Sequence, residues 1–457
     1  MITIYRSHLS PLWTAVLFTL YFFVFLTSEV FLQDCLLALD RPGDLHTFFL
    51  GQLACLTAGY LSLALCRRAS YGLLRSLAVA AILLPALLFS ALALTGSPSS
   101  LPAWAAACSY CLGGAGAFLH YSAALCLRHS AVSGRLAGGS IGLAVGIQFL
   151  TDTCLDSGQT AMLLALVSLV LAMLLARAPA PAPAAADEAP SSPPSRRTLA
   201  LATAGTAILS IVVGLNEDIV TRLYATGELD VTSWPRLCYL AGLLLAGFLA
   251  DIRKRAFMPV ITLCVLMLSN MAIFFLNDPR HYQLNLSILY FYSGFYVVYF
   301  TVLFLDLAPG TRWPLLWAGM GRLCRSLCVG AFFLCPNGLF GLLGQGCSVV
   351  LNSLLLAGVC AIFFWSGQLR DHGSARSAPP VRQDQAIGLF AQKHALTRRE
   401  TDVLRAVLAS SEPLGNIAIC LGISERVMQR HLTSIYAKCR VSGRLELVTA
   451  FFGQTSP

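Results

Sequence analysis

The chain has 457 residues, of which 57% are hydrophobic and only 12% are charged, and its formal net charge is +9. Soluble domains carry about a quarter charged residues and just under half apolar ones. The composition therefore excludes a water-soluble globular protein over most of the length and indicates that much of the surface faces lipid.

Apolar runs of about 20 residues, which is the length that crosses a bilayer core as a helix, recur along the chain. They predict about twelve spans, and hence an all-α polytopic membrane bundle. The runs cover residues 12–32, 45–66, 77–94, 103–126, 136–155, 160–176, 199–215, 235–250, 257–276, 284–305, 314–334 and 345–366. The first run is too long for a cleaved signal peptide, so we expect it to remain as a span.

A segment rich in Pro and Ala divides these spans into two groups of six. Residues 177–198 read RAPAPAPAAADEAPSSPPSRRT, a composition typical of an extended linker. We therefore predict a first six-helix membrane half over residues 1–176, a cytoplasmic linker over 177–198 and a second six-helix half over 199–366.

The distribution of charged residues predicts the orientation. If the N-terminus is cytoplasmic, most of the arginines outside the spans fall on the inner side, and the outer side holds only Arg41, Arg222, Arg236 and Arg280. Acidic residues gather on the outer side, at Asp34, Asp40, Asp44, Asp152, Asp156, Glu217, Asp218, Glu228, Asp230 and Asp278. Because Arg and Lys mark cytoplasmic loops, both termini are predicted to be cytoplasmic, in the inner (cytoplasmic) membrane of a bacterium.

The segment GFLADIRKR follows the eighth predicted span. Its residues Gly247, Leu249, Ala250, Asp251 and Arg255 match a Gly-x-Leu-Ala-Asp-x-x-x-Arg motif. This motif and the arrangement of two six-span halves together resemble the major facilitator superfamily. The resemblance implies a facilitator-like bundle with a central cavity. The corresponding position in the first half, LALCRRASYG, lacks the Asp, and a simple positive-inside anchor is the alternative explanation.

Polar residues inside the spans are candidates for ligand contact, because burying them in a bilayer is costly. Arg322 and Arg325 lie three residues apart on one face of a predicted span. They are expected to form an anion site or, alternatively, to reach the membrane interface or pair with a carboxylate. Tyr292 and Tyr296 lie one helical turn apart, so they are expected either to pack against a neighbouring helix or to line a pocket for an aromatic ligand. Glu29, near the end of the first span, is either interfacial or a ligand contact.

The apolar pattern stops after Trp365. Residues 367–389 contain Gly, Ser, Pro and Arg, and are predicted to be a tether. Residues 390–457 are amphipathic. Their first predicted helix starts after Thr397, which is a plausible N-cap, and Glu400 completes a capping box. Short helical patterns on either side of a tight turn at 422–424 are typical of a helix-turn-helix, so we predict a four-helix C-terminal domain.

This C-terminal region resembles the LuxR/GerE-type family of bacterial DNA-binding domains. The matching positions are Leu396, Thr397, Arg399, Glu400, Val403, Leu404, Ile417, Ala418, Leu421, Ile423, Ser424, Met428, His431, Ile435, Lys438, Arg444 and Leu447. The family's usual Lys and Asn in the recognition helix are Gln429 and Ser434 here, so its sequence preference does not transfer.

The resemblance implies a DNA surface on the third helix of the domain. We expect major-groove contacts from Arg426, Gln429, Arg430, Thr433 and Ser434, and phosphate contacts from Lys438 and Arg440. Proteins of this kind read paired half-sites, so the chain is expected to be a dimer on DNA.

No catalytic constellation, metal-ligand spacing or cofactor motif is present, so we expect no enzyme, no metal and no cofactor. The leading hypothesis is a membrane-bound one-component transcriptional regulator, with double-stranded DNA, lipid and a small-molecule ligand as partners. The alternative is a secondary transporter with an appended regulatory domain, which the scarcity of acids within the predicted spans disfavours. A third hypothesis is that the C-terminal domain binds another protein instead of DNA.

Overall fold

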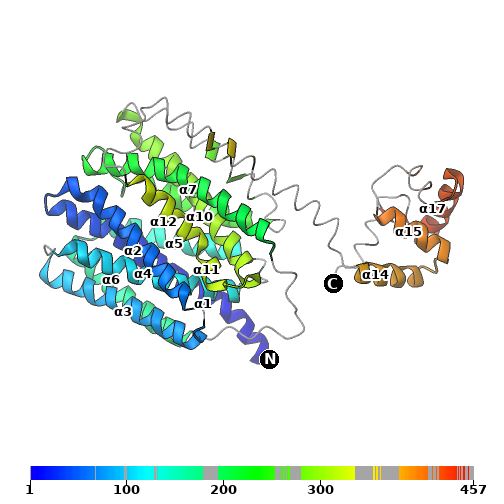
Figure 1. The fold of residues 1–457 in the computed structure, drawn as a ribbon, viewed down its shortest axis with the longest axis horizontal. Coiled ribbons are helices and arrows are strands. Elements are labelled where there is room, and N and C mark those ends of the chain that lie inside the picture. The colour runs from blue at the N-terminus through cyan, green and yellow to red at the C-terminus, as the bar shows by residue number, and fades with distance from the viewer. Residues whose placement is uncertain are drawn as a thin grey trace. The chain divides into compact units, whose positions relative to one another are not determined.

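The computed structural model describes residues 2–66, 68–96, 100–127, 130, 132–178, 194–252, 279–334, 380–409 and 421–439, with scattered residues among 258–267, 354–361 and 414–451. The chain divides into two compact units, a membrane unit, Met1–Ser366, and a C-terminal unit, Gly367–Pro457. All regular secondary structure in the described ranges is helical (Figure 1).

The first half of the membrane unit has one helix for each predicted span. They are α1 (Ile2–Ala38), α2 (Leu45–Leu65), α3 (Tyr71–Thr95), α4 (Leu101–Cys126), α5 (Ser133–Cys154) and α6 (Ser157–Arg177). Local signals set two of the starts. The Ser70 hydroxyl accepts a hydrogen bond from the Leu73 N–H, and Asp156 forms a capping box with Gln159.

The second half departs from the prediction in two places. Its described helices are α7 (Arg196–Ala225), α8 (Arg236–Ala250), α10 (Tyr282–Leu307), α11 (Pro314–Ala318) and α12 (Met320–Phe332). The span predicted to end at residue 215 continues to Ala225, and the span predicted over 314–334 is two helices separated at Gly319. Most of the predicted spans 257–276 and 345–366, and most of the linker, lie outside the described residues.

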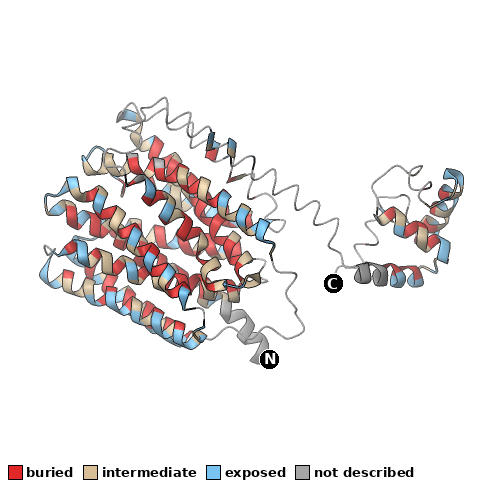
Figure 2. Cartoon of the chain, in the orientation of Figure 1, coloured by how far each residue is buried: buried red, intermediate tan, exposed pale blue. Residues whose placement is uncertain are grey.

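The membrane unit is a multi-pass helical bundle. Six of the described helices are long and apolar enough to cross a membrane. On α3 the side chains of Leu84, Leu87 and Leu94 are 41%, 66% and 86% exposed, while Ile82 and Phe89 on the same helix are fully buried. Figure 2 shows this alternation of buried and exposed residues along α3. A leucine face of this kind is stable where it meets lipid, so the exposed residues form the lipid-facing surface.

The two halves meet where α5 crosses α8. A Cβ on Gly138 would lie 2.4 Å from the Leu243 carbonyl oxygen and 2.8 Å from the Cα of Gly247, so these helices approach on glycine. At the same crossing the Asp251 carboxylate accepts hydrogen bonds from the backbone N–H groups of Gly134 (2.7 Å) and Arg135 (3.0 Å). Asp251 of the predicted motif therefore caps the start of α5.

The C-terminal unit has its own hydrophobic core. Its described helices are α14 (Pro380–Lys393), α15 (Arg398–Ala409) and α17 (Glu425–Cys439). The buried core residues are Ile387, Phe390, Val403, Leu404, Val407, Ala418, Met428, Leu432, Ile435, Cys439, Leu447 and Phe451. Within the predicted tether, α14 begins at Pro380, and Ile387 of this helix is buried in the same core.

Local signals predicted two features of this unit correctly. The capping box at the start of α15 is present, since the Glu400 N–H lies 3.3 Å from Thr397 Oγ1 and the Thr397 N–H lies 2.7 Å from Glu400 Oε2. The turn before α17 places Gly422 at φ 66°, a backbone conformation that favours glycine.

Candidate functional site

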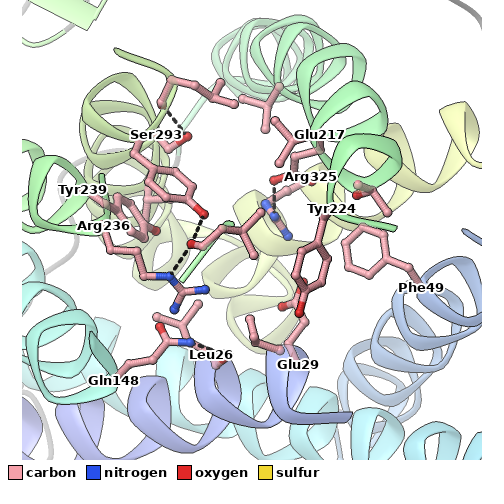
Figure 3. A pocket seen from close by; sticks show the side chains of 18 of the residues that line it. Leu26, Glu29, Phe49, Gln148, Glu217, Tyr224, Arg236, Tyr239, Ser293 and Arg325 are labelled. Atoms are coloured by element: carbon pink, nitrogen blue, oxygen red, sulfur yellow. Dashed lines mark hydrogen bonds and ion pairs between the residues drawn. The ribbon is translucent and has the colours of Figure 1, made fainter. Parts of the chain in front are cut away.

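A cavity of about 170 Å³ lies between the two halves of the membrane unit. Its wall is formed by α1, α2 and α5 of the first half and by α7, α8, α10 and α12 of the second. In Figure 3 the labelled charged and aromatic side chains surround this space, with Glu29 and Gln148 on one side and Glu217 and Arg325 on the other. Aromatic walls with a few polar groups are typical of small-molecule sites.

Two arginines of the wall are paired with carboxylates. Arg325 on α12 donates to Glu217 on α7 at 2.5 Å. Arg236 at the start of α8 lies 3.3 Å from Asp152 on α5 and also donates to the Val231 carbonyl at 3.0 Å. Each pair joins separate helices, so these charges also hold the wall together.

Hydroxyl groups complete much of the wall. Tyr224 donates to Asp34, and Tyr296 lies 2.5 Å from the Ser210 hydroxyl. Tyr290 donates to the Val231 carbonyl at 2.9 Å. These bonds fix the rings around the cavity, because each hydroxyl has a partner on another segment.

Arg322 lies on the cavity wall without a carboxylate partner in the described part of the chain. The residue is 4% exposed, and its guanidinium carbon lies 4.8 Å, 5.1 Å and 5.8 Å from the ring centroids of Phe22, Phe25 and Phe300. Its Nη2 atom has no hydrogen-bond partner among the described residues. Stacking on aromatic faces accommodates the cation but leaves its N–H groups free to meet an anion.

Glu29 is an acidic residue of the same cavity wall. It stands on α1, lines the cavity and is half-buried. Within the described ranges no ion pair or hydrogen bond involves its carboxylate. A carboxylate in this position is costly unless water or a ligand solvates it.

The structure brings together four of the five predicted ligand-binding residues. Arg322, Arg325, Tyr296 and Glu29 all line the cavity, whereas Tyr292 is fully buried and packs against Tyr296 at 6.1 Å between ring centroids. Whether the four contact a ligand stays a prediction.

Sequence reasoning missed Glu217 and Arg236, which it had assigned to the outer surface. A usable signal was present, because Val213, Glu217, Val220 and Tyr224 recur at helical spacing and all line the cavity. The hydropathy boundary at residue 215 hid that pattern.

In the C-terminal unit the predicted DNA-contacting residues fall into two groups. Arg426, Gln429, Arg430 and Thr433 are exposed on α17. Ser434 and Lys438 instead donate to the Glu400 carboxylate, both at 2.6 Å. Arg440 lies outside the described residues.

The Glu400 carboxylate is therefore the centre of a network that joins α15 to α17. Burial raises its pKa, but hydrogen bonds from Lys438, Ser434 and Thr397 outweigh burial and lower the pKa to about 2. The carboxylate is thus charged at neutral pH, and it holds Lys438 against the domain.

Comparison with known proteins identifies the fold of the membrane unit. Neither a family model nor a curated protein sequence matches the chain. Among solved structures, the human organic anion transporter MFSD10 (TETRAN) aligns with a TM-score of 0.55 and 14% identity, over 78% of this chain and 99% of that one. The major facilitator transporter FucP in its outward conformation aligns with a TM-score of 0.52 and 10% identity, over 77% and 98%.

A variant of FucP, described as the fucose:proton symporter of E. coli, aligns with a TM-score of 0.51 and 12% identity, over 78% and 98% of the two chains. Identities this low establish the fold alone. The membrane unit has the major facilitator transporter fold. The predicted facilitator-like bundle is thereby confirmed, and the helix-turn-helix stays a prediction.

Proposed function

We propose that this chain binds a small organic molecule in the central cavity and acts as a secondary transporter with an appended C-terminal regulatory domain. The observation that carries the proposal is the cavity itself, whose wall combines charged and aromatic side chains from both halves. A site shared between two halves changes shape when the halves rock, which is how transporters of this fold expose a site alternately to each side.

The carboxylates of the wall support transport. The sequence alone suggested few acids within the spans, yet Glu217 on α7 lines the cavity and Asp152 on α5 pairs with a wall arginine. Intramembrane carboxylates are the usual carriers of protons in coupled transport.

Uptake tests this proposal directly. The full-length chain reconstituted into vesicles should accumulate radiolabelled organic anions or amino acids when a proton gradient is imposed, and collapse of the gradient with an ionophore should abolish accumulation. Binding to the cavity without any uptake, under either sign of gradient, would contradict the transporter proposal.

A second candidate function is a membrane-bound transcriptional regulator that senses its ligand in the same cavity. The specific observation in its favour is the LuxR/GerE-like pattern over residues 396–447, whose predicted capping box is present at Thr397 and Glu400. Ligand binding would have to favour one membrane-unit state that differs in how it presents the C-terminal unit.

Mapping of the DNA that is bound by the intact chain in cells separates the two candidates. A regulator should occupy discrete promoter sites, and this occupancy should change when the ligand is added. Removal of residues 370–457 should then abolish occupancy while leaving any transport intact. No discrete sites with or without ligand would rule the regulator out.

A further inference from the structure

The charge balance of the cavity narrows the class of ligand. Of the three arginines on its wall, Arg325 is paired with Glu217 and Arg236 with Asp152. Neither Arg322 nor Glu29 forms an ion pair within the residues that the structure describes. The cavity therefore offers one unused positive charge and one unused negative charge.

Both unused charges belong to the same stretch of wall. The Arg322 guanidinium packs on the rings of Phe22 and Phe25, which are residues of α1. Glu29 stands on α1 four residues after Phe25, and residues four apart occupy the same helix face, about 5–6 Å from each other. Arg322 and Glu29 thus both neighbour Phe25, and no ion pair joins them in the described part of the chain.

Burial explains why the pair of unused charges is informative. Arg322 is only 4% exposed. Its Nη2 group is a hydrogen-bond donor that finds no acceptor among the described residues. An unsatisfied buried donor persists where a ligand or water supplies the missing acceptor. Glu29 presents the matching requirement for a donor or cation.

We propose that the cavity recognises a small zwitterion, with the ligand carboxylate on Arg322 and its ammonium on Glu29. This inference rests on the proposed function, since it assigns a ligand class to the same cavity. The apolar part of the ligand packs among the wall aromatics, such as Phe49 and Tyr239. A cavity of about 170 Å³ is of the size that holds one ring, because a cavity of about 150 Å³ binds benzene.

Matched triplets of probes test the proposal on the full-length chain in detergent. Each triplet consists of an amino acid, the acid that lacks its amine and the amine that lacks its carboxylate, for phenylalanine, tyrosine and leucine. The thermal unfolding midpoint is measured against probe concentration. In at least one triplet the amino acid should bind roughly tenfold or more tightly than either truncated molecule, because each truncation leaves one buried charge unpaired.

Two variants assign the two ends. Arg322→Met should reduce the affinity for the amino acid to about the affinity for the amine alone. Glu29→Gln should reduce it to about the affinity for the acid alone. Each variant should leave the truncated molecule that lacks the affected group unchanged. Arg312→Gln, an exposed change outside the cavity wall, is the control and should alter none of these affinities.

The outcomes separate this inference from the function itself. Acids or amines that bind as tightly as the amino acids in every triplet, or amino acids that leave the midpoint unchanged, overturn the zwitterion assignment. Uptake of a simple anion would overturn it while leaving the transporter proposal in place. A zwitterion that binds through Arg322 and Glu29 but is never taken up supports this ligand assignment and contradicts the transporter proposal.

Discussion

Charged residues behave differently in the two units of this protein. In the membrane unit several are buried or half-buried and pair across the sequence, as in Arg325 with Glu217, 108 positions away, and Arg236 with Asp152, 84 positions away. In the C-terminal unit the arginines whose burial the structure describes are exposed, and one buried carboxylate, Glu400, organises Lys438 and Ser434.

The difference shows where an unpaired charge carries information. A solvated cation on α17 costs little whether or not it meets a ligand, so its exposure says nothing about DNA. A buried cation is costly unless something compensates it, so the lack of a carboxylate partner beside Arg322 points to a ligand. Three predictions test this contrast, and a fourth tests the packing between the two halves.

The largest effect is expected from breaking the Arg325–Glu217 pair. Arg325→Met should lower the free energy of unfolding by up to about 3–5 kcal/mol, because it leaves the half-buried Glu217 carboxylate without its cation. Thermal unfolding of the full chain in detergent measures the loss. The double variant Arg325→Met with Glu217→Leu should recover most of it.

Arg322→Met is the matched comparison for that experiment. It removes the same charge from the same helix but breaks no ion pair among the described residues, so its loss of stability should be clearly smaller. Equal losses from the two variants would remove the distinction between a paired arginine and one reserved for a ligand.

The glycine contact between the halves should give the next effect. Gly138→Ala would place a Cβ 2.4 Å from the Leu243 carbonyl oxygen and should destabilise the chain by about 1–3 kcal/mol through overpacking. Gly139→Ala is the control, because nothing lies within 4 Å of its Cβ and alanine favours a helix by about 0.5–1 kcal/mol. The unfolding midpoints should therefore shift in opposite directions.

Removing the Glu400 carboxylate should cost about 1–2 kcal/mol in the C-terminal unit, because a helix cap and a link to α17 are lost. The pKa of Glu400 is about 2 in the folded chain, below its ordinary 4.5, so its contribution is complete above about pH 4.5 and disappears as the pH falls toward 2. The stability of wild type and Glu400→Gln in urea can be measured against pH, with hydrogen exchange of α15 and α17 as the readout. The two stability curves should converge at low pH.

The smallest effect on stability is expected at the surface of α17. Arg430→Ala should change the free energy of unfolding by less than about 0.5 kcal/mol, because the side chain is exposed. If the regulator candidate is correct, it should weaken DNA binding in a gel-shift assay of the full chain. Arg398→Ala, which removes the same charge from an exposed position on α15, should leave binding unchanged.

Local patterns were enough to predict most of the architecture. Hydrophobic run length identified the helices of the first half, and the Thr397–Glu400 box located the start of α15, because both signals depend on neighbouring residues alone. The signals failed where distant residues changed the local cost. The apolar run of α7 ends near residue 215, but Arg325 compensates Glu217 and allows the helix to continue to Ala225.

The sequence by itself determined that this is a helical membrane protein in two halves with a separate C-terminal unit, because hydropathy, helix caps and linker composition act locally. Only the tertiary structure decided what each buried charge does. Arg322 and Arg325 are three residues apart and indistinguishable in the sequence, yet one stacks on phenylalanines and the other bonds to Glu217. The partner of a buried charge comes from another helix, and the folded bundle selects it.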